Sequence, residues 1–414
     1  MNLIPRDSYL TQINNGLKYV PIIVLIGARQ VGKSSILKML TSKESIIFDG
    51  QDIEHSELFQ QYSTIENYLK INLNTDISGT VFIDEFQYIS NISVVLKLLV
   101  DRNPNLKIIV SGSSSLDIRQ KVEESLAGRV RVIEVFSLSF KEYLLFKDKD
   151  LSLLYTKYLY DTEVAIINKN ILSLYNEYLI FGGLPRAALA DGSVDKIEIL
   201  DDIYKTYLLK DVRSYIRGED FIAFNKLLKV LSSQIGNMLN VHKLSDTISL
   251  SYARCEEYLD ILQQMYIIRL LPPYVSNKRR EITKMEKVFF LDIGLRNIVY
   301  NGFNDMEYRV DNGALFENYV YLELLKKTDK SYNFYYYRTK DGAEIDFIVN
   351  NHYSIIPIEV KFKNYTKAKK IRSLTSFCER ENLPVSYVVN RNLAYNYDGT
   401  VYVPGSLVGL LNLS

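Results

Sequence analysis

Two stretches near the N-terminal end have the residue types and spacing of a phosphate site. The first reads Gly27-Ala-Arg-Gln-Val-Gly-Lys33-Ser34, between an apolar run and a helical one. In this G-x-x-x-x-G-K-S pattern the backbone N–H groups curl round phosphates, the lysine neutralises their charge and the serine holds Mg²⁺. The sequence therefore predicts a site for ATP and Mg²⁺, lined by Gly27, Ala28, Arg29, Gln30, Val31, Gly32, Lys33, Ser34 and Ser35.

The second stretch is "TVFIDEF", an apolar run that ends in Asp84 and Glu85. An aspartate at this place would bind the Mg²⁺ through water, and the following glutamate would polarise the attacking water. A later apolar run ends in "SGSSS", whose hydroxyls would reach the same sheet edge. Ser113 is our candidate for sensing the γ-phosphate. Ser111 and Ser114 stay open for that role, as do plain loop or capping roles for all three.

A third group of chemically capable residues lies in "EIDFIVNNHYSIIPIEVKFK", Glu344–Lys363. Alternation predicts a β-hairpin in which Glu359 and Lys361 share a face and Asp346 lies across from them. Two such carboxylates would bind a divalent cation, and the lysine would stabilise charge on a phosphodiester. Glu317, on a predicted amphipathic helix, could add an oxygen ligand. The alternative is an ordinary cross-strand Glu/Lys pair on a half-exposed strand.

The elements that must position these residues form an α/β pattern. Between residues 20 and 136, short β-rich runs alternate with longer helical stretches, which is typical of a parallel sheet covered by helices. The predicted strands are Ile22–Ile26, Ser45–Phe48, Val81–Ile83, Lys107–Val110 and Arg131–Val135. In the last third, a helix is predicted at Gly313–Lys327 and strands at Asn333–Arg338, Ile345–Val349, Ser354–Val360, Val385–Val389 and Thr400–Val403.

The length of 414 residues fits two or three domains at roughly 150 residues each. We predict a P-loop ATPase core at 1–138, a helical lid at 139–215, a winged-helix-like module at 216–286 and a C-terminal α/β domain at 287–414. The third part reads helix, helix, turn, helix. The helix after the turn begins with Tyr252 and Arg254, which are followed by acidic residues, and this favours a packing role over the reading of bases. Lys278–Arg280 could still contact phosphates.

Composition bounds the partners and the compartment. Lys and Arg total 50 and Asp and Glu 49, so any nucleic-acid site must be a local patch. One such patch is the acid-free basic run Lys361, Lys363, Lys367, Lys369, Lys370 and Arg372. Two distant cysteines and three histidines indicate no structural zinc site, and a cytoplasmic location is expected. The apolar run Tyr19–Ile26 is too short to span a bilayer, so no membrane partner is predicted.

"GARQVGKSS", "VFIDEFQYI", "VSGSSS", "LAGRVRVIEVFSLSFKEYL" and "FGGLPR", in that order, resemble a large family of prokaryotic AAA-type ATPases with a C-terminal domain of unknown function. The resemblance covers nearly the whole chain and implies an AAA-type core. It also implies a γ-phosphate or intersubunit role for Arg129, with surface pairing as the alternative. Pro185 in "GGLP" is similar to the proline that packs on adenine in signal-transducing ATPases, with a helix-starting turn as the alternative. Arg186 stands where many members of the family have an acid.

The order Glu317, Asp346, Glu359-x-Lys361 resembles the PD-(D/E)XK nucleases. This implies a restriction-endonuclease-like C-terminal domain with Asp346, Glu359 and Lys361 catalytic, and Asp346, Glu359 and Glu317 holding metal. Three hypotheses follow: an ATP-regulated enzyme that cuts or grips DNA or RNA, a signalling switch with a silent interaction domain, and an assembling motor. The protein partner and the oligomeric state stay open.

Overall fold

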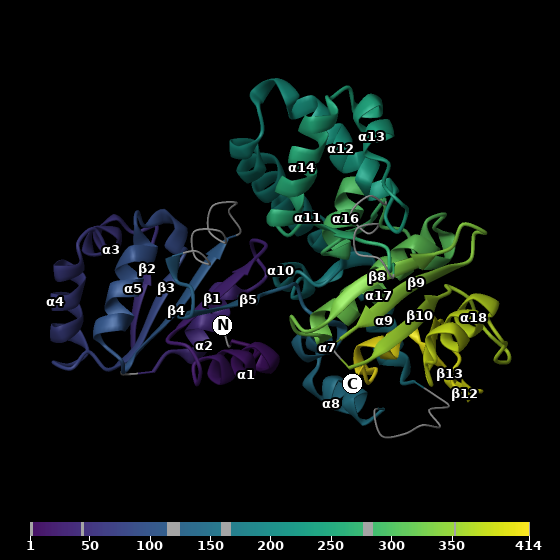
Figure 1. Ribbon diagram of the computed structural model, residues 1–414, viewed down its shortest axis with the longest axis horizontal. Helices are drawn as coiled ribbons and strands as arrows, with labels where there is room; N and C mark the ends of the chain where they lie inside the picture. The colour runs from purple at the N-terminus through teal and green to yellow at the C-terminus, as the bar shows by residue number, and fades with distance from the viewer. Residues whose placement is uncertain are drawn as a thin grey trace. The chain divides into compact units, whose positions relative to one another are not determined.

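The computed structural model describes residues 3–42, 45–113, 125–158, 167–275, 285–351 and 353–413, apart from the side chains of 208–211 and 214. The chain forms two compact units (Figure 1). The first comprises Met1–Phe136 with Gln264–Tyr266, and the second Ser137–Gln263 with Ile267–Ser414. The finer division into four parts stays a prediction.

The first unit is built on a parallel five-stranded sheet. Its strand order is β2-β3-β4-β1-β5, so β1 lies between β4 and β5 and is buried along its whole length. The Ile- and Val-rich composition of these strands suits burial on both faces. All five predicted strands are confirmed, as β1 (Ile22–Gly27), β2 (Ser45–Asp49), β3 (Gly79–Asp84), β4 (Leu106–Ser113) and β5 (Val130–Glu134).

In the part of the chain that the structure describes, helices connect β1 to β2, β2 to β3 and β3 to β4, as parallel crossovers require. They colour purple to blue in Figure 1. The described helices are α1 (Asp7–Gly16), α2 (Lys33–Leu40), α3 (Ile53–Leu58), α4 (Tyr62–Asn72) and α5 (Ile92–Arg102). The first unit is therefore an α/β domain in which the phosphate loop follows the central strand.

The second unit begins with helices, as the sequence predicts for 139–211. They are α7 (Phe140–Lys147), α8 (Lys149–Lys157), α9 (Lys169–Phe181), α10 (Pro185–Ala188), α11 (Gly192–Ile203) and a π-helix at Tyr204–Asp211. Phe140 of α7 makes edge-to-face ring contacts with Tyr155 of α8 and Tyr175 of α9, and a tilted contact with Tyr178 of α9. Such pairs hold helices together through their large buried area and their electrostatics.

The next segment contains three helices and a small sheet. These are α12 (Phe221–Ser233), α13 (Val241–Ile248) and α14 (Tyr252–Gln264), then the antiparallel pair β6 (Ile268–Leu271) and β7 (Lys287–Phe290). The predicted helices and turn are present. Lys278–Arg280, between the two strands, lie outside the described residues. Helix α16 (Ile293–Tyr300) follows.

The C-terminal part is a mixed six-stranded sheet of order β12-β13-β11-β10-β9-β8. Strands β8, β9 and β10 are antiparallel neighbours, while β11 is parallel to β10 and β13. The strands are β8 (Asn333–Arg338), β9 (Glu344–Asn350), β10 (Ile355–Val360), β11 (Ser386–Asn390), β12 (Tyr395–Tyr397) and β13 (Thr400–Pro404). Five were predicted. The exposed three-residue edge strand β12 was not, because it lacks an apolar face.

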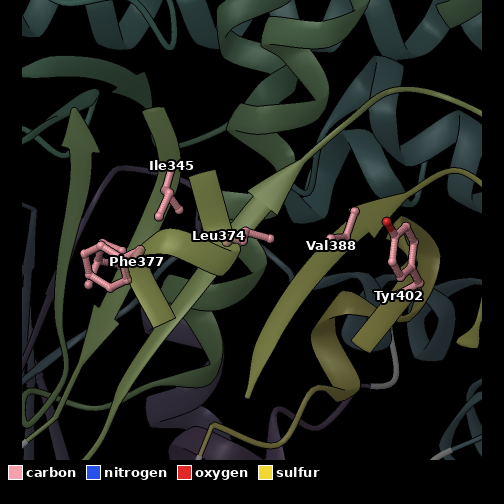
Figure 2. Close-up of a cluster of buried hydrophobic side chains, with 6 residues drawn as sticks. Ile345, Leu374, Phe377, Val388 and Tyr402 are labelled. Atoms are coloured by element: carbon pink, nitrogen blue, oxygen red, sulfur yellow. The ribbon is translucent and has the colours of Figure 1, made fainter. Parts of the chain in front are cut away.

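Helix α17 (Asn312–Lys327) precedes this sheet in the sequence, and α18 (Arg372–Glu381) lies between β10 and β11. Figure 2 shows Leu374 and Phe377 of α18 beside side chains of β9, β11 and β13. This core anchors the strands that carry Asp346 and Glu359. None of the described helices combines the length and hydropathy needed to cross a bilayer.

Candidate functional site

The phosphate loop connects β1 to α2 through three residues with positive φ, of which Gln30 has φ 62 and the other two are glycines. Gly27 has φ +154, and a Cβ there would lie 2.1 Å from the Val135 carbonyl oxygen. Gly32 has φ 97 and caps the N-terminus of α2. Side chains are disfavoured in both conformations, which explains both glycines. The loop from Gly27 to Ser35 therefore has the predicted strand-to-helix context, with helical N–H groups available for an anion.

Lys33 is the first residue of α2 and is 6% exposed. Its Nζ donates to the carbonyl oxygens of Gly27 at 2.9 Å and Ala28 at 2.7 Å. Burial lowers the pKa of Lys33 to about 8, although the Glu85 and Asp84 carboxylates partly oppose the shift. An ammonium enclosed by the loop in this way is placed to meet phosphate oxygens.

The acidic pair lies where β3 ends, as predicted. Ser111 of the neighbouring strand β4 donates to Asp84, and so does the backbone N–H of Glu85 at 3.1 Å. Ser113 donates to Glu85 at 3.4 Å. The structure thus brings both described serine candidates to the acids. Ser114 lies outside the described residues.

Gln87 is a site residue that the sequence reasoning missed. Its Nε2 donates to the hydroxyl of Ser113 at 2.9 Å and to the carboxylate of Glu85. A Cβ on Gly112 would lie 2.7 Å from the Gln87 side-chain oxygen, so the neighbouring strand leaves room for this amide. Gln87 therefore orients the carboxylate predicted to act on water. Its position two residues after Glu85 was the available signal.

Arg6 is a second missed residue, and it supports the phosphate loop from outside the motif. Its side chain is 3% exposed. One guanidinium nitrogen donates to the carbonyls of Val31 in the loop and Phe136 after β5, each at 2.9 Å. The partners are 25 and 130 residues away, so no local pattern could have identified the role. Arg6 joins the loop to the rest of the sheet.

We expect Arg6→Ala to weaken ATP binding by roughly tenfold, because a buried carbonyl of the loop loses its charged donor. Titration with a fluorescent ATP analogue measures the change. Arg102→Ala removes an exposed arginine that stacks on Tyr62 in the same unit, and should leave the affinity unchanged. Equal affinity in Arg6→Ala and the wild type would show that Arg6 does not shape the loop.

Arg129 and the loop residue Arg29, both predicted to belong to the nucleotide site, make side-chain contacts within the first unit. Arg129 pairs with Asp101 at 2.5 Å, and both side chains are more than one-third exposed. This corresponds to the surface-pairing alternative for Arg129, while a role at a γ-phosphate stays a prediction. Arg29 donates to the Tyr88 hydroxyl at 3.4 Å.

The "FGGLP" turn has a packing explanation within the second unit. The Gly183 N–H donates to the Asp292 carboxylate at 3.0 Å, and its carbonyl accepts from Leu138 at 2.7 Å. A Cβ on Gly182 would lie 2.4 Å from the Gly294 nitrogen. Pro185 is the first residue of α10, where proline is favoured. The turn is thus accounted for without ligand, and adenine contact by Pro185 stays a prediction.

The residues of the predicted C-terminal site do converge. The antiparallel register pairs Ile358 with Phe347, and one further step places Glu359 opposite Asp346. The Lys361 Nζ lies 2.5 Å from Glu359 Oε1 and 3.9 Å from Asp346 Oδ2. Asp346 Oδ2 also accepts from the Val360 N–H at 2.7 Å. The hairpin geometry predicted from alternation therefore fits the structure.

A second lysine, not singled out from the sequence, lies in the same place. The Lys287 Nζ is 3.1 Å from Glu317, 2.7 Å from Glu344 and 3.9 Å from Asp346. We call Lys287, Glu317, Glu344, Asp346, Glu359 and Lys361 the carboxylate cluster. The available signal was a lysine that directly precedes the apolar run "VFF".

Burial and mutual repulsion make several cluster carboxylates weak acids. Burial and the nearby Asp346 raise the pKa of Glu317 to about 8 and that of Glu359 to about 7. Burial also raises the pKa of Asp346, against the pull of Lys287 and Lys361. Burial lowers the pKa of Lys287, but the charges of Glu317 and Asp346 outweigh it, so the pKa is raised overall. The cluster thus retains ammonium groups among partly protonated acids.

One buried carboxylate oxygen of the cluster has no hydrogen-bond donor among the described residues. Glu359 is 6% exposed, and its Oε2 has no hydrogen-bond partner among the described residues. Within the same ranges, no group of three or more Asp, Glu, His or Cys side chains is arranged to hold a metal ion. As placed, the residues fit a lysine-neutralised cluster rather than a metal site built from Glu317, Asp346 and Glu359. Metal binding by those three stays a prediction.

Arg254, the basic residue at the start of α14, is held within its own unit. It pairs with Asp220 at 2.8 Å and with Glu219 at 2.9 Å, and Tyr258 also donates to Asp220 at 2.6 Å. An arginine engaged in this way is poorly available to read bases. The geometry agrees with the packing interpretation of this segment.

Family models match three parts of the chain. Residues 19–144 match an AAA domain, 172–306 a domain of unknown function (DUF8612) and 312–406 another domain of unknown function (DUF4143). The first match spans the parallel sheet, the phosphate loop and the acidic pair. Together these features support an AAA-type P-loop ATPase domain, and with it ATP binding, in the N-terminal unit.

The chain is also similar to several curated proteins. An uncharacterized protein of Methanocaldococcus jannaschii is 24% identical over 96% of this chain and 86% of its own length. One of Mycobacterium tuberculosis is 24% identical over 84% and 71%, and one of Haemophilus influenzae is 25% identical over 87% of each.

Two solved structures are similar at lower levels. A Walker-type ATPase of Pyrococcus abyssi is 17% identical over 72% of this chain and 95% of its own, with a TM-score of 0.47. A chain of the Drosophila ORC bound to DNA is 12% identical over 73% and 96%, with a TM-score of 0.31. Scores this low give no basis for transferring residues or partners.

Proposed function

We propose that the N-terminal domain hydrolyses ATP with Mg²⁺ and that its nucleotide state controls how a C-terminal nuclease-like domain engages nucleic acid. The observation that carries the first part is Lys33, enclosed by the loop and within electrostatic reach of Asp84 and Glu85. The free thiols Cys255 and Cys378 fit a cytoplasmic protein.

Each residue of the nucleotide site has a role in this proposal. Lys33 would neutralise charge on the β- and γ-phosphates, and the hydroxyl of Ser34 and the carboxylate of Asp84 would hold Mg²⁺. These hard oxygen donors suit that ion, which when bound would neutralise developing phosphate charge. Glu85, oriented by Gln87, would position the attacking water.

Engagement of nucleic acid is supported by the charge beside the carboxylate cluster. An acid-free run of basic side chains follows β10 and ends at the first residue of α18. The exposed members are Lys361, Lys363, Lys367, Lys369, Lys370 and Arg372. Exposed Lys and Arg side chains bind phosphates by releasing counterions, largely without regard to sequence. We call this run the basic segment.

Charge reversal of Lys367, Lys369 and Lys370 to Glu should weaken DNA and RNA binding by at least roughly tenfold and reduce its salt dependence. Fluorescence anisotropy with single-stranded, duplex and branched oligonucleotides, with ATP or ADP present, measures both quantities. The matched control reverses Lys226, Lys229 and Lys243, which are exposed on α12 and α13. Binding that is absent from the wild type, or equally weakened by both triple variants, would contradict the assignment to the basic segment.

Cleavage is measured with the same oligonucleotides. Asp346, Glu359 and Lys361 lie together as the resemblance to PD-(D/E)XK nucleases requires. Cleavage in Mg²⁺ or Mn²⁺ that is lost in both Asp346→Ala and Lys361→Ala would extend the function from binding to hydrolysis. If the oligonucleotides stay intact, the domain binds nucleic acid without cleaving it.

A second candidate function is a signalling switch whose C-terminal domain is a catalytically silent interaction module. The observation that favours it is Lys287, which already neutralises carboxylates that a nuclease would offer to metal. In that case ATP would turn over slowly and the domain would bind a protein. If adding the protein leaves the anisotropy of every oligonucleotide unchanged, the protein binds none of them, and this candidate is favoured.

A further inference from the structure

We infer that Lys287 is the resident cation of the carboxylate cluster and excludes a divalent metal from it. The side chain stands between Glu317 and Asp346, two of the three residues predicted to hold metal. This inference deepens the proposed function, on which it rests for treating the cluster as nuclease-like. It concerns which cation the cluster accepts.

The contacts of Lys287 are those of a bound cation. Its Nζ reaches carboxylate oxygens from two different elements, Glu317 of α17 at 3.1 Å and Glu344 of β9 at 2.7 Å. Asp346, also of β9, is 3.9 Å away. An ammonium has three donors, and here at least two of them meet carboxyl oxygens. The oxygens that face Lys287 are therefore already engaged.

The surroundings keep this lysine in place. Its side chain is 3% exposed, and the Nζ lies 5.5 Å from the centre of the Tyr336 ring. The Lys287 backbone belongs to β7, which pairs with β6. It also forms an isolated antiparallel β-bridge with the backbone of Met238. Lys287 contacts Oε1 of Glu317, and a Cβ on Gly236 would lie 3.1 Å from the other carboxylate oxygen, Oε2. Among the described residues, these contacts bury the ammonium and hold it against the carboxylates.

The other lysine of the cluster differs in exposure. Lys361 pairs with Glu359 at 2.5 Å, but its side chain is 46% exposed. Lys361 can therefore turn toward a phosphate in solvent, whereas the Lys287 side chain is buried. Glu359 keeps a buried oxygen, Oε2, with no partner among the described residues. Once the Lys287 charge is removed, this oxygen and the carboxylates of Glu317, Glu344 and Asp346 would attract a small dication.

The test measures Mn²⁺ binding by the full chain without nucleotide. Electron paramagnetic resonance reports the concentration of free Mn²⁺ and therefore how much is bound. The wild type should have no Mn²⁺ site that depends on Glu359. Lys287→Met should gain one Mn²⁺ site per chain, because the carboxylates then lack the ammonium charge. That site should vanish in Lys287→Met/Glu359→Gln. Lys287→Arg keeps the charge and should behave as the wild type does.

Lys196→Met is the matched control. Lys196 is also buried, at 2% exposed, and its Nζ lies 3.1 Å from Glu177, which is not a member of the carboxylate cluster. This variant should gain no Mn²⁺ site. If Lys287→Met folds only when Mn²⁺ is added, judged by circular dichroism and thermal melting, the inference is supported, since the dication has replaced the ammonium.

Three results would overturn the inference. They are a Glu359-dependent Mn²⁺ site in the wild type, no gained site in folded Lys287→Met, and a Lys287→Met chain that stays unfolded in millimolar Mn²⁺. None of these measurements uses nucleic acid. A wild type that binds no oligonucleotide would therefore refute the proposed function while leaving the assignment of Lys287 intact.

Discussion

Replacing Lys33 with methionine is expected to reduce ATP hydrolysis by roughly 10²-fold or more and to weaken ATP binding. Lys33 supplies the positive charge at the phosphate loop, and its Nζ now contacts two loop carbonyls, of Gly27 and Ala28. Methionine has a similar length and suits the buried position, so the variant removes charge with little change in volume. Phosphate release and isothermal titration with ATP measure the two effects.

The matched control for this experiment is Lys38→Met, an exposed lysine of the same helix α2. It should hydrolyse ATP at the wild-type rate, which separates the role of the loop lysine from a general effect of charge on α2. Thermal melting verifies that both variants are folded. Unchanged turnover in folded Lys33→Met would refute the assignment of the loop as the nucleotide site.

Replacing Asp311 with asparagine is expected to lower the free energy of unfolding of the second unit by about 3–5 kcal/mol. Its carboxylate pairs with two buried arginines. The distances are 2.5 Å to Arg296, which is fully buried, and 2.8 Å to Arg309. A neutral side chain at this position would leave two buried guanidinium charges without their counter-charge. Urea unfolding followed by circular dichroism measures the loss.

The same network predicts a dependence on pH. Burial works to raise the pKa of Asp311, but the hydrogen bond from Arg309 and the charge of Arg296 outweigh it and lower the pKa overall. Because the folded-state pKa lies below the unfolded value of about 3.9, the contribution is fully present above that pH. It is lost as the pH falls through the folded-state pKa. The stability difference between the wild type and Asp311→Asn should therefore shrink in strong acid.

Glu307→Gln is the control for Asp311→Asn, because Glu307 forms an exposed ion pair with Arg391 and lies close by in the sequence. Exposed pairs contribute about 0–1 kcal/mol, so this variant should unfold almost as the wild type does. Equal stability losses in the two variants would contradict a special role for the buried pair of arginines.

Much of the fold could be predicted from local patterns. All five strands of the first unit and five of the six in the C-terminal sheet follow from runs of apolar residues or from alternation. The convergence of Asp346, Glu359 and Lys361 also followed, because an antiparallel hairpin joins residues that are close in the sequence. The exposed strand β12 did not, since its residues have no buried face to produce a pattern.

The sequence by itself determined the nucleotide loop of this protein, because that chemistry depends on glycines, a lysine and a serine at fixed local spacing on a strand–helix turn. Only the tertiary structure decided which distant residues complete each site. Arg6 meets the loop and the end of β5, and Lys287 enters a cluster built from α17, β9 and β10. Such contacts arise when separate elements pack, and a buried charge then takes whichever oppositely charged or polar partners that packing brings within reach.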